Sequence, residues 1–378
     1  MLLRNVMIYR NRMRKFIPGD ILITDGVIRK VGKIEEHTEN EIDGKGAYVV
    51  PGLVDVHTHG RVGLDFVSAS PRDYGVLATD YARHGVTTVM PTLATAPYEQ
   101  MLKATDALNR FTPQAGEATF CGVHWEGRYM NPIKKGAHCA ELLAPPVPEE
   151  LEAEVFRKCK ALHISVASEL DPDGRFLAAA RRLGATLGLA HTTATYEEAK
   201  LAESRGVTSY THLFNAMPSL HHRDGGAVCA ALEGTAICEL ICDGIHISPE
   251  MIRLVYRVKG AESISLISDS IEAAGVEDGA YNIAGVHAEV KNGIARTKDG
   301  ALAGSTIALD SAVNNLIDFC KIPLTDAILA ATETPAKQVG VFERCGSIEP
   351  GKQGDLLILK DARRLDIKSV VLRGEMLR

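Results

Sequence analysis

The chain has 378 residues, of which 46% are hydrophobic and 24% charged, a composition typical of a globular protein with one large core and room for a smaller domain. Acidic residues outnumber basic ones by 48 to 42, and no stripe of Lys and Arg alternates with aromatic residues, which argues against nucleic acid as a partner. The N-terminal segment lacks the apolar region of a signal peptide, and no apolar run approaches the ~18–20 residues that span a bilayer. We therefore expect no membrane partner and a cytoplasmic location.

Both ends of the chain predict β-structure. Residues 1–49 contain DILITDGVIRKVGK, and residues 345–378 contain GDLLILKDARRLDIKSVVLRGE. Both segments alternate in hydrophobicity and carry Asp-Gly or Arg-Gly turn signals, which favour β-hairpins. Neither segment alone can bury the face of a sheet. We therefore expect the two segments to pair into one small β-sandwich-like domain.

Residues 50–344 repeat a different pattern, in which eight apolar, β-branched runs are each followed by a stretch of helical character. The runs are LVDVH, VTTVMP, TFCGVH, ISVAS, TLGLAH, TSYTH, CELICD and ISLISD. Such alternation is typical of a parallel sheet with crossover helices, and eight strand-helix units need about 250 residues. The predicted fold class is α/β, a (β/α)8 TIM barrel accompanied by the terminal β domain.

Five of the eight runs end in, or continue directly into, a residue that can bind a metal ion or move a proton. Because the carboxyl ends of barrel strands converge on one mouth, we expect these residues to meet there. In VDVHTHG, His57 and His59 are two apart and project to the same side of an extended strand end, which predicts half of a metal site. In HWEG, Glu126 stands where a carboxylate could bind one metal ion or bridge two. Glu169 in ASELD is the rival carboxylate.

His191 and His212 close two consecutive apolar runs. A lone histidine at such a place is often a core residue, but two of them in a barrel that already shows His-x-His predict metal ligands. Asp269 ends the last run, where its carboxylate could face a metal-bound water and act in catalysis. Its alternative role is to cap the following helix.

These residue types favour amide hydrolysis. A divalent ion held by His and Glu lowers the pKa of a bound water from about 15.7 toward about 7 and polarises a carbonyl oxygen. A neighbouring carboxylate can accept the water proton and return it to the departing nitrogen. We expect one or two ions per chain, with Zn²⁺ or Fe²⁺ favoured and Co²⁺ or Mn²⁺ as alternatives.

Several motifs of the chain, taken together and in order, resemble the N-acetylglucosamine-6-phosphate deacetylase family of the amidohydrolase superfamily over nearly the whole length. They are PGLVDVHTHG, HWEGRYMNPIKKGAH, AHTTATYEEA, THLFNAMPSLHHRDGG, CDGIHISPE, ISDSIEAAG, DGALAGSTIALD and ATETPAKQVG. The resemblance implies that Glu126, His191 and His212 bind the principal metal ion and that Asp269 is the general acid/base. Some members lack the His-x-His pair and use one ion, so its presence here implies a second ion with Glu126 as a possible bridge.

The same resemblance implies a set of residues that contact a phosphorylated N-acetyl amino sugar. They are His138 near the acetyl group, His246 at the sugar, Asn215 and Ala216 as backbone donors to the phosphate, Arg223, and the loop residues Leu302, Ala303 and Gly304. The family often supplies the phosphate-binding arginine from a neighbouring subunit, which implies a homodimer in which Arg223 reaches the neighbouring site.

The chain departs from the family pattern at a few places, and other activities stay open. Arg61 and Arg128 stand where the family usually has other residues, and either could add a second anion contact. The sequence does not separate the substrate N-acetylglucosamine 6-phosphate from its 4-epimer, N-acetylgalactosamine 6-phosphate. A cyclic-amide hydrolase of the dihydroorotase or hydantoinase type shares the HTHG motif, although such enzymes commonly bridge their metals with a modified lysine. A phosphosugar-binding regulator on the same barrel is the non-enzymatic alternative.

Overall fold

Eight parallel strands form a barrel in the computed structural model, which describes residues 1–283 and 285–377. In order around the barrel they are β6 (Leu53–Thr58), β9 (Val86–Ala94), β10 (Thr119–Phe120) continued by β11 (Val123–Glu126), β12 (Leu162–Val166), β13 (Thr186–Leu189), β14 (Ser209–Tyr210), β15 (Ile237–Ile241) and β16 (Ile264–Ile267). The barrel closes where the chain after β16 meets β6, and the backbone N–H of Asp269 donates to His57 O (2.9 Å). The eight predicted runs are therefore the eight barrel strands, and the predicted TIM barrel is confirmed.

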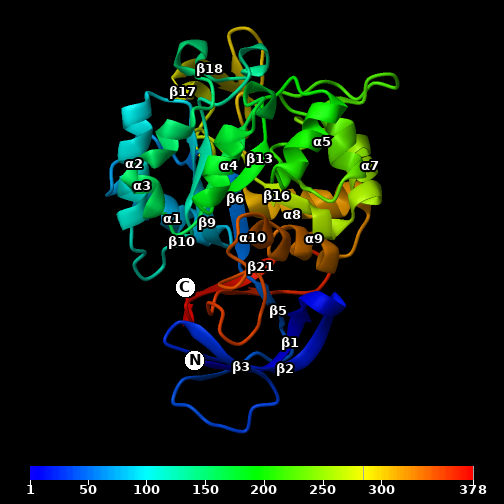
Figure 1. Cartoon of the computed structure of the whole chain (residues 1–378). Helices are drawn as coiled ribbons and strands as arrows, with labels where there is room; N and C mark the ends of the chain where they lie inside the picture. Colours follow the sequence, from blue (N-terminus) through cyan, green and yellow to red (C-terminus); the bar gives the residue numbers. More distant parts are fainter. Residues whose placement is uncertain (284, 378) are drawn as a thin grey trace.

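Each barrel strand is followed by a helix on the outside of the barrel (Figure 1). The helices are α1 (Asp73–Arg83), α2 (Tyr98–Arg110), α3 (Glu154–Arg157), α4 (Arg175–Arg182), α5 (Tyr196–Ser204), α6 (Gly226–Glu233), α7 (Pro249–Lys259) and α8 (Leu309–Cys320), followed by α9 (Leu324–Ala330) and α10 (Glu333–Gln338). Local sequence sets their limits. At α5, for example, Thr195 and Glu198 form a capping box, and Gly206 has a positive φ of 106° just beyond the end. Among the helices of the described ranges, none is both long and apolar enough to cross a membrane.

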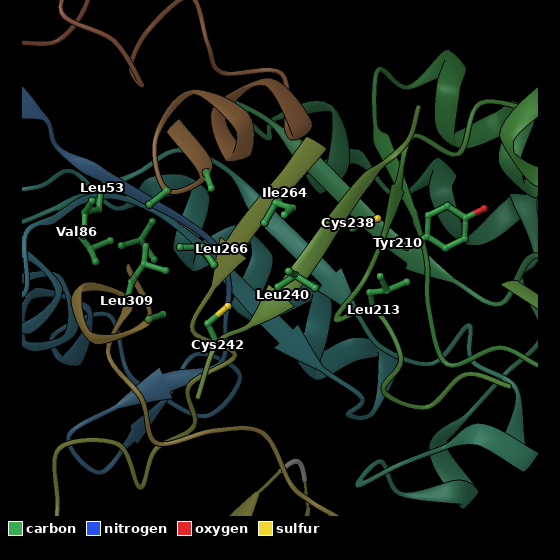
Figure 2. Packing of buried hydrophobic residues seen from close by; sticks show 14 of the residues in the cluster. Leu53, Val86, Tyr210, Leu213, Cys238, Leu240, Cys242, Ile264, Leu266 and Leu309 are labelled. Carbon is green, nitrogen blue, oxygen red and sulfur yellow. The ribbon is translucent and has the colours of Figure 1, made fainter. Parts of the chain in front are cut away.

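The main hydrophobic core lies between the strands and the surrounding helices. Figure 2 shows Leu240 of β15 and Leu266 of β16 packed in the same cluster as Leu309 of α8, and all three side chains are at most 1% exposed. Because the strands are covered on both faces, their sequences are nearly continuous apolar runs rather than alternating ones. The polar residues that interrupt these runs therefore call for a functional or structural reason.

Strands from both ends of the chain form a second sheet at one end of the barrel, where both termini lie (Figure 1). Its strands are β1 (Leu2–Arg10), β2 (Lys15–Thr24), β3 (Val27–Gly32), β4 (Glu41–Asp43), β5 (Tyr48–Pro51), β20 (Leu356–Leu359), β21 (Ile367–Leu372) and β22 (Glu375–Met376). Asp25-Gly26 and Arg373-Gly374 make the tight turns of two hairpins, and all four residues have positive φ. The expected pairing of the two ends is thus confirmed, while the proposed limits at residues 49 and 345 stay a prediction.

A small antiparallel sheet, which the motifs did not predict, follows β16 and lies at the other end of the barrel (Figure 1). It consists of β17 (Gly279–Ile283), β18 (Val286–Lys291) and β19 (Ile294–Thr297), and a shorter pair, β7 (Gly60–Arg61) and β8 (Leu64–Asp65), follows β6. A sequence signal existed, because Asn292-Gly293 turns β18 into β19 with φ values of 52° and 72° between alternating buried and exposed residues. This sheet and the loop after it cover the mouth of the barrel.

Candidate active site

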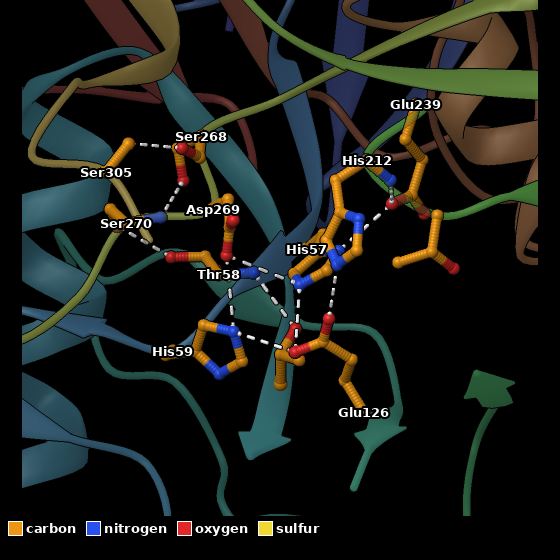
Figure 3. A network of polar contacts seen from close by, with 12 residues as sticks. His57, Thr58, His59, Glu126, His212, Glu239, Ser268, Asp269, Ser270 and Ser305 are labelled. Atoms are coloured by element: carbon orange, nitrogen blue, oxygen red, sulfur yellow. Dashed lines mark hydrogen bonds and ion pairs between the residues drawn. The ribbon is translucent and has the colours of Figure 1, made fainter. Parts of the chain in front are cut away.

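Six of the predicted residues meet at the barrel mouth in two groups. Figure 3 shows His57, His59, Glu126, His212 and Asp269 close together. The first group is Glu126, His191 and His212, and the second group is His57, His59 and Asp269. Within each group, one potential ligand atom per residue lies within 4.8 Å of the others, and all six side chains are buried. The spatial convergence expected from the strand ends is therefore present.

Glu126, the last residue of β11, lies between the two histidines of the first group and the two histidines of the second. Its Oε1 is 2.9 Å from His212 Nε2 and 3.4 Å from His191 Nε2. Its Oε2 is 3.1 Å from His59 Nε2 and 3.4 Å from His57 Nε2. Because each carboxylate oxygen faces a different pair of imidazoles, this side chain has the geometry of a bridge between two cations.

Three of the six residues share an unusual backbone position. His191, His212 and Asp269 are each the second residue after a barrel strand, and their φ angles are 43°, 31° and 47°. Residues other than glycine rarely adopt the left-handed region, which costs about 1–3 kcal/mol each. Such strain persists only where the surrounding structure fixes it, and it is typical of functional sites.

Hydrogen bonds at Nδ1 orient two of the histidines. His57 Nδ1 donates to Glu239 Oε2 (3.0 Å), and His191 Nδ1 donates to the backbone oxygen of Lys134 (2.8 Å). In its neutral form each ring then carries its lone pair on Nε2, which is the atom that faces Glu126. Sequence reasoning missed Glu239 and Lys134, although a glutamate inside the apolar run CELICD and a lysine in PIKKGAH were visible signals.

The charges of the site perturb its carboxyl and imidazole groups strongly. Burial would raise the pKa of Asp269, but His57 and His59 outweigh it and the pKa is lowered. The pKa of Glu126 is likewise held well below its usual range by His57, His191 and His212 against the effect of burial. Burial lowers the pKa of His59, yet hydrogen bonds to Asp269 and Glu126 raise it to about 9. Without a cation, His57 and His59, whose pKa values are both raised, therefore hold protons beside the ionised carboxylates.

A cavity of about 360 Å³ opens beside the two groups, and its size suits a phosphorylated monosaccharide. Seven of the eight residues implied as substrate contacts line it, namely His138, Asn215, Ala216, His246, Leu302, Ala303 and Gly304. Arg223 does not line it, because this residue lies exposed in the loop after β14, where its Nη1 contacts His222. Lys134, Asp65 and Ile283 also line the cavity and were not foreseen.

His138 presents a hydrogen-bond donor to the cavity. Its Nδ1 accepts from the backbone N–H of Thr95 (3.3 Å) and lies 2.8 Å from Thr95 Oγ1. The proton of the neutral ring is then on Nε2, which lies 3.8 Å from Glu126 Oε2. Burial lowers the pKa of His138 to about 3, so the ring is neutral at physiological pH. The group can donate to a carbonyl oxygen bound beside Glu126.

The turn after β14 offers donors at one end of the cavity. The backbone N–H of Asn215 already donates to His212 O (3.0 Å), whereas that of Ala216 has no hydrogen-bond acceptor among residues 1–283 and 285–377. Lys134 Nζ donates to Met217 O (3.0 Å) and so brings a positive charge to the same turn. Of the two expected backbone donors, the N–H of Ala216 is therefore the one that is available to donate to a bound anion, and the Lys134 ammonium group lies beside the same turn.

The loop Leu302–Gly304 lies close to the catalytic candidate. Gly304 has a φ of 59°, and a Cβ atom there would lie 3.0 Å from Asp269 O and 2.6 Å from Ile271 Cγ2. Ser305 N donates to Asp269 O (2.8 Å), which fixes the loop against the strand end. Glycine is needed at this position both for its backbone conformation and for the close approach to Asp269.

Three residues with open roles lie outside the two groups and outside the cavity lining. Arg61 is paired with Asp80 (2.8 Å) and Arg128 with Glu150 (3.1 Å), and neither arginine lines the cavity, so the suggested second anion contact stays a prediction. Glu169, the rival carboxylate, accepts hydrogen bonds from Thr192, Thr193 and Asn131 and holds the loop after β13. Glu126 is therefore the carboxylate that faces the histidines.

Comparisons with known proteins cover almost the whole chain. Residues 48–377 match the amidohydrolase family. The chain is 31% identical over 358 residues to the N-acetylgalactosamine-6-phosphate deacetylase of Escherichia coli O157:H7, which covers 94% of this chain and 93% of the relative. It is 33% identical over 316 residues to the N-acetylglucosamine-6-phosphate deacetylase of Vibrio furnissii, which covers 82% and 78% of the two chains. The solved structure of the N-acetylglucosamine-6-phosphate deacetylase of Thermotoga maritima is similar with a TM-score of 0.88 at 31% identity, and covers 100% of this chain and 99% of that chain.

Proposed function

Because the chain belongs to the amidohydrolase family, and within it to the N-acetylglucosamine-6-phosphate deacetylases that its motifs resemble, we propose that it hydrolyses N-acetylglucosamine 6-phosphate to glucosamine 6-phosphate and acetate. The observation that carries this proposal is the position of Glu126 between two histidine groups, at the wall of a sugar-sized cavity. The cytoplasmic location and the role in amino-sugar catabolism belong to the same proposal.

The residues of both groups fit a divalent cation. Each group contains two histidines. Glu126 directs Oε1 toward the two histidines of the first group and Oε2 toward the two histidines of the second. Within the part of the chain that the structure describes, His57 Nε2 is buried without a hydrogen-bond partner, as expected of a nitrogen that binds a metal ion once its proton is displaced. We assign Glu126, His191 and His212 to the principal ion and His57 and His59 to a second one bridged by Glu126. A His/Glu donor set suits Zn²⁺ or Fe²⁺ and accepts Co²⁺ or Mn²⁺.

A divalent cation bound there supplies an acidified water and polarises the carbonyl of the acetyl group. Asp269, ionised because its pKa is lowered, accepts a proton from the attacking water. His138 donates from Nε2 to the carbonyl oxygen, where negative charge develops. Asp269 then returns the proton to the nitrogen, because an amine leaves readily and an amide anion does not.

The phosphate binds at the turn after β14 in this proposal. The free N–H of Ala216 donates to it, Lys134 supplies a positive charge from the same chain, and Asn215 shapes the turn. His246, whose Nδ1 donates to Asp243 (2.6 Å), contacts the sugar, and the loop Leu302–Gly304 covers it. We assign Arg223, which lies outside the cavity of its own chain, to the phosphate of a neighbouring subunit in a homodimer.

Acetate release from N-acetylglucosamine 6-phosphate, with and without chelator, tests the reaction. We expect release that stops on chelation, resumes with added metal, and falls strongly for the unphosphorylated sugar. Release from dihydroorotate or a hydantoin instead would show a cyclic-amide hydrolase, an alternative that the carboxylate bridge Glu126 disfavours. Absence of hydrolysis with retained phosphosugar binding would show a regulator.

The 4-epimer is the second candidate substrate, because one relative of 31% identity is an N-acetylgalactosamine-6-phosphate deacetylase. The two sugars differ in the orientation of a single hydroxyl group, so the comparison of kcat/KM for both phosphosugars decides between them. We expect the higher value for the gluco form, and a higher value for the galacto form would change the substrate but not the reaction.

A further inference from the structure

Glu239 lies in the middle of β15 with its side chain completely buried and outside the cavity lining. Burying a carboxylate is costly unless it accepts several hydrogen bonds or pairs with a positive charge. No step of the reaction derived above uses this carboxylate directly, so its place inside an apolar barrel strand must be explained by what it contacts, beginning with His57.

The hydrogen bonds of Glu239 connect the site with the far end of the barrel. Its Oε2 accepts from His57 Nδ1 (3.0 Å) and from the backbone N–H of His212 (3.1 Å), and Figure 3 shows it beside both residues. Its Oε1 accepts from Nε2 of Gln338 (2.6 Å), a residue of α10. Figure 1 shows α10 on the side of the barrel that faces the terminal sheet. Both carboxylate oxygens are therefore used.

The contact with His57 decides which nitrogen of that ring can bind a metal ion. With Nδ1–H donated to Glu239, the neutral ring keeps its lone pair on Nε2. That atom lies 3.4 Å from Glu126 Oε2 and 3.4 Å from Asp269 Oδ1. The opposite tautomer would place a proton on Nε2 and block a cation at this position.

We propose that Glu239 is a positioning residue that fixes the tautomer and orientation of the His57 ring and so determines whether the second group holds its metal ion. The proposal rests on the two-ion site of the proposed function. The first group receives the equivalent support from a backbone oxygen, since His191 Nδ1 donates to Lys134 O. Loss of the Glu239 carboxylate removes the partner of a ring nitrogen only in the second group, at His57, whereas in the first group it removes the acceptor of a backbone N–H, that of His212. We therefore expect the larger effect on the second ion.

Three variants separate this role from general support of the barrel. Glu239→Leu removes the acceptor at similar size. In Glu239→Gln the oxygen of the new amide can still accept from His57 Nδ1. Its NH2 group then faces Gln338, whose amide can rotate and accept with Oε1, a buried atom without a hydrogen-bond partner in the described chain. Gln338→Leu is the matched control, which disturbs the same network but leaves the contact between Glu239 and His57.

The full-length proteins are stripped of metal, loaded again with Zn²⁺, and analysed for ions per chain and affinity. We expect two ions in the wild type, in Glu239→Gln and in Gln338→Leu, and one ion in Glu239→Leu, whose second-site affinity falls about 10–100-fold. With Mn²⁺, electron paramagnetic resonance should change from a coupled pair to an isolated ion in Glu239→Leu. Two ions of wild-type affinity in Glu239→Leu, loss of both ions there, or loss of an ion in Gln338→Leu would each overturn the proposal.

A measurement on the wild type covers the case that Glu239→Leu does not fold. Nitrogen-15 spectra of the Zn²⁺-loaded protein should show His57 protonated at Nδ1 and metal-bound at Nε2, and a proton on Nε2 would overturn the proposal. A wild type that takes up one ion overturns the role of Glu239 but leaves a one-ion deacetylase. A wild type that binds two ions but releases no acetate overturns the proposed substrate and leaves the role of Glu239 standing.

Discussion

The two ligand groups of the site lie side by side but are assembled in different ways. The first group takes Glu126, His191 and His212 from the ends of three separate strands, and two of these residues have left-handed backbone. The second group takes His57 from β6, His59 from the position directly after β6, and Asp269 from the second position after β16, at the seam where the barrel closes. The first group therefore forms because the barrel brings the ends of three strands together, and the second group forms where the first and last strands of the barrel meet.

The support behind the two groups differs as well. Lys134 O orients His191, and a backbone oxygen is present whatever the side chain is. The side-chain carboxylate of Glu239 orients His57, and a single substitution of Glu239 removes this support. The comparison teaches that the orientation of the His191 ring does not depend on a side chain behind it, whereas the orientation of the His57 ring does. The following experiments test this difference, beginning with the largest expected effect.

Glu126→Gln should prevent metal binding at both positions, because the carboxylate of Glu126 faces both pairs of histidines. We expect a loss of both ions and of acetate release, with a decrease in kcat larger than that of any other single variant. Elemental analysis and steady-state kinetics measure the two effects. A variant that keeps one tightly bound ion would show that Glu126 belongs to one group only.

Asp269→Asn should separate catalysis from metal binding. The amide cannot accept the water proton, so kcat should fall on the order of 10²-fold or more, while the first group keeps its ion. Rates and metal content are measured on the same preparation. An unchanged kcat would show that Asp269 does not transfer the proton and is only a metal ligand or a structural residue.

Lys134→Met should weaken phosphate recognition without touching the support of His191, because the backbone oxygen remains. We expect KM for the phosphorylated sugar to rise about 10-fold, the size of a charged hydrogen bond, with little change in kcat or metal content. Lys135→Met is the control, since Lys135 Nζ contacts Gly136 O (3.4 Å) and does not line the cavity. Equal effects of the two variants would argue against a phosphate contact of Lys134.

The affinity of the second group for a metal ion should depend on pH, because its two histidines carry protons that the ion must displace. Below its raised pKa of about 9, the metal-free His59 is protonated, and His57 has a pKa raised well above its usual value by Glu126, Asp269 and Glu239 despite burial. Metal uptake must displace these protons, so affinity should rise with pH up to about 9, by up to ~10-fold per unit for each proton released. Calorimetry in buffers of different ionisation enthalpy counts the protons. Uptake at pH 7 without proton release would contradict these raised pKa values.

The amino-acid sequence by itself determined the barrel and the residues at its mouth. Apolar runs buried on both faces are visible as letters, and a polar residue at the end of such a run marks the mouth of the barrel. His57, His59, Glu126, His191, His212 and Asp269 could therefore be named as one set before any coordinates were known. The Asp-Gly and Arg-Gly turns likewise identified hairpins in the terminal sheet.

Only the tertiary structure decided how these residues are used. That each oxygen of Glu126 faces a different pair of histidines depends on the relative positions of strands far apart in the sequence. The partnership of Glu239 with His57 spans 182 positions, and the exclusion of Arg61 and Arg128 from the cavity depends on their partners Asp80 and Glu150. Sequence patterns record which face of an element is buried, but distances and hydrogen-bond partners across the barrel arise only when it closes.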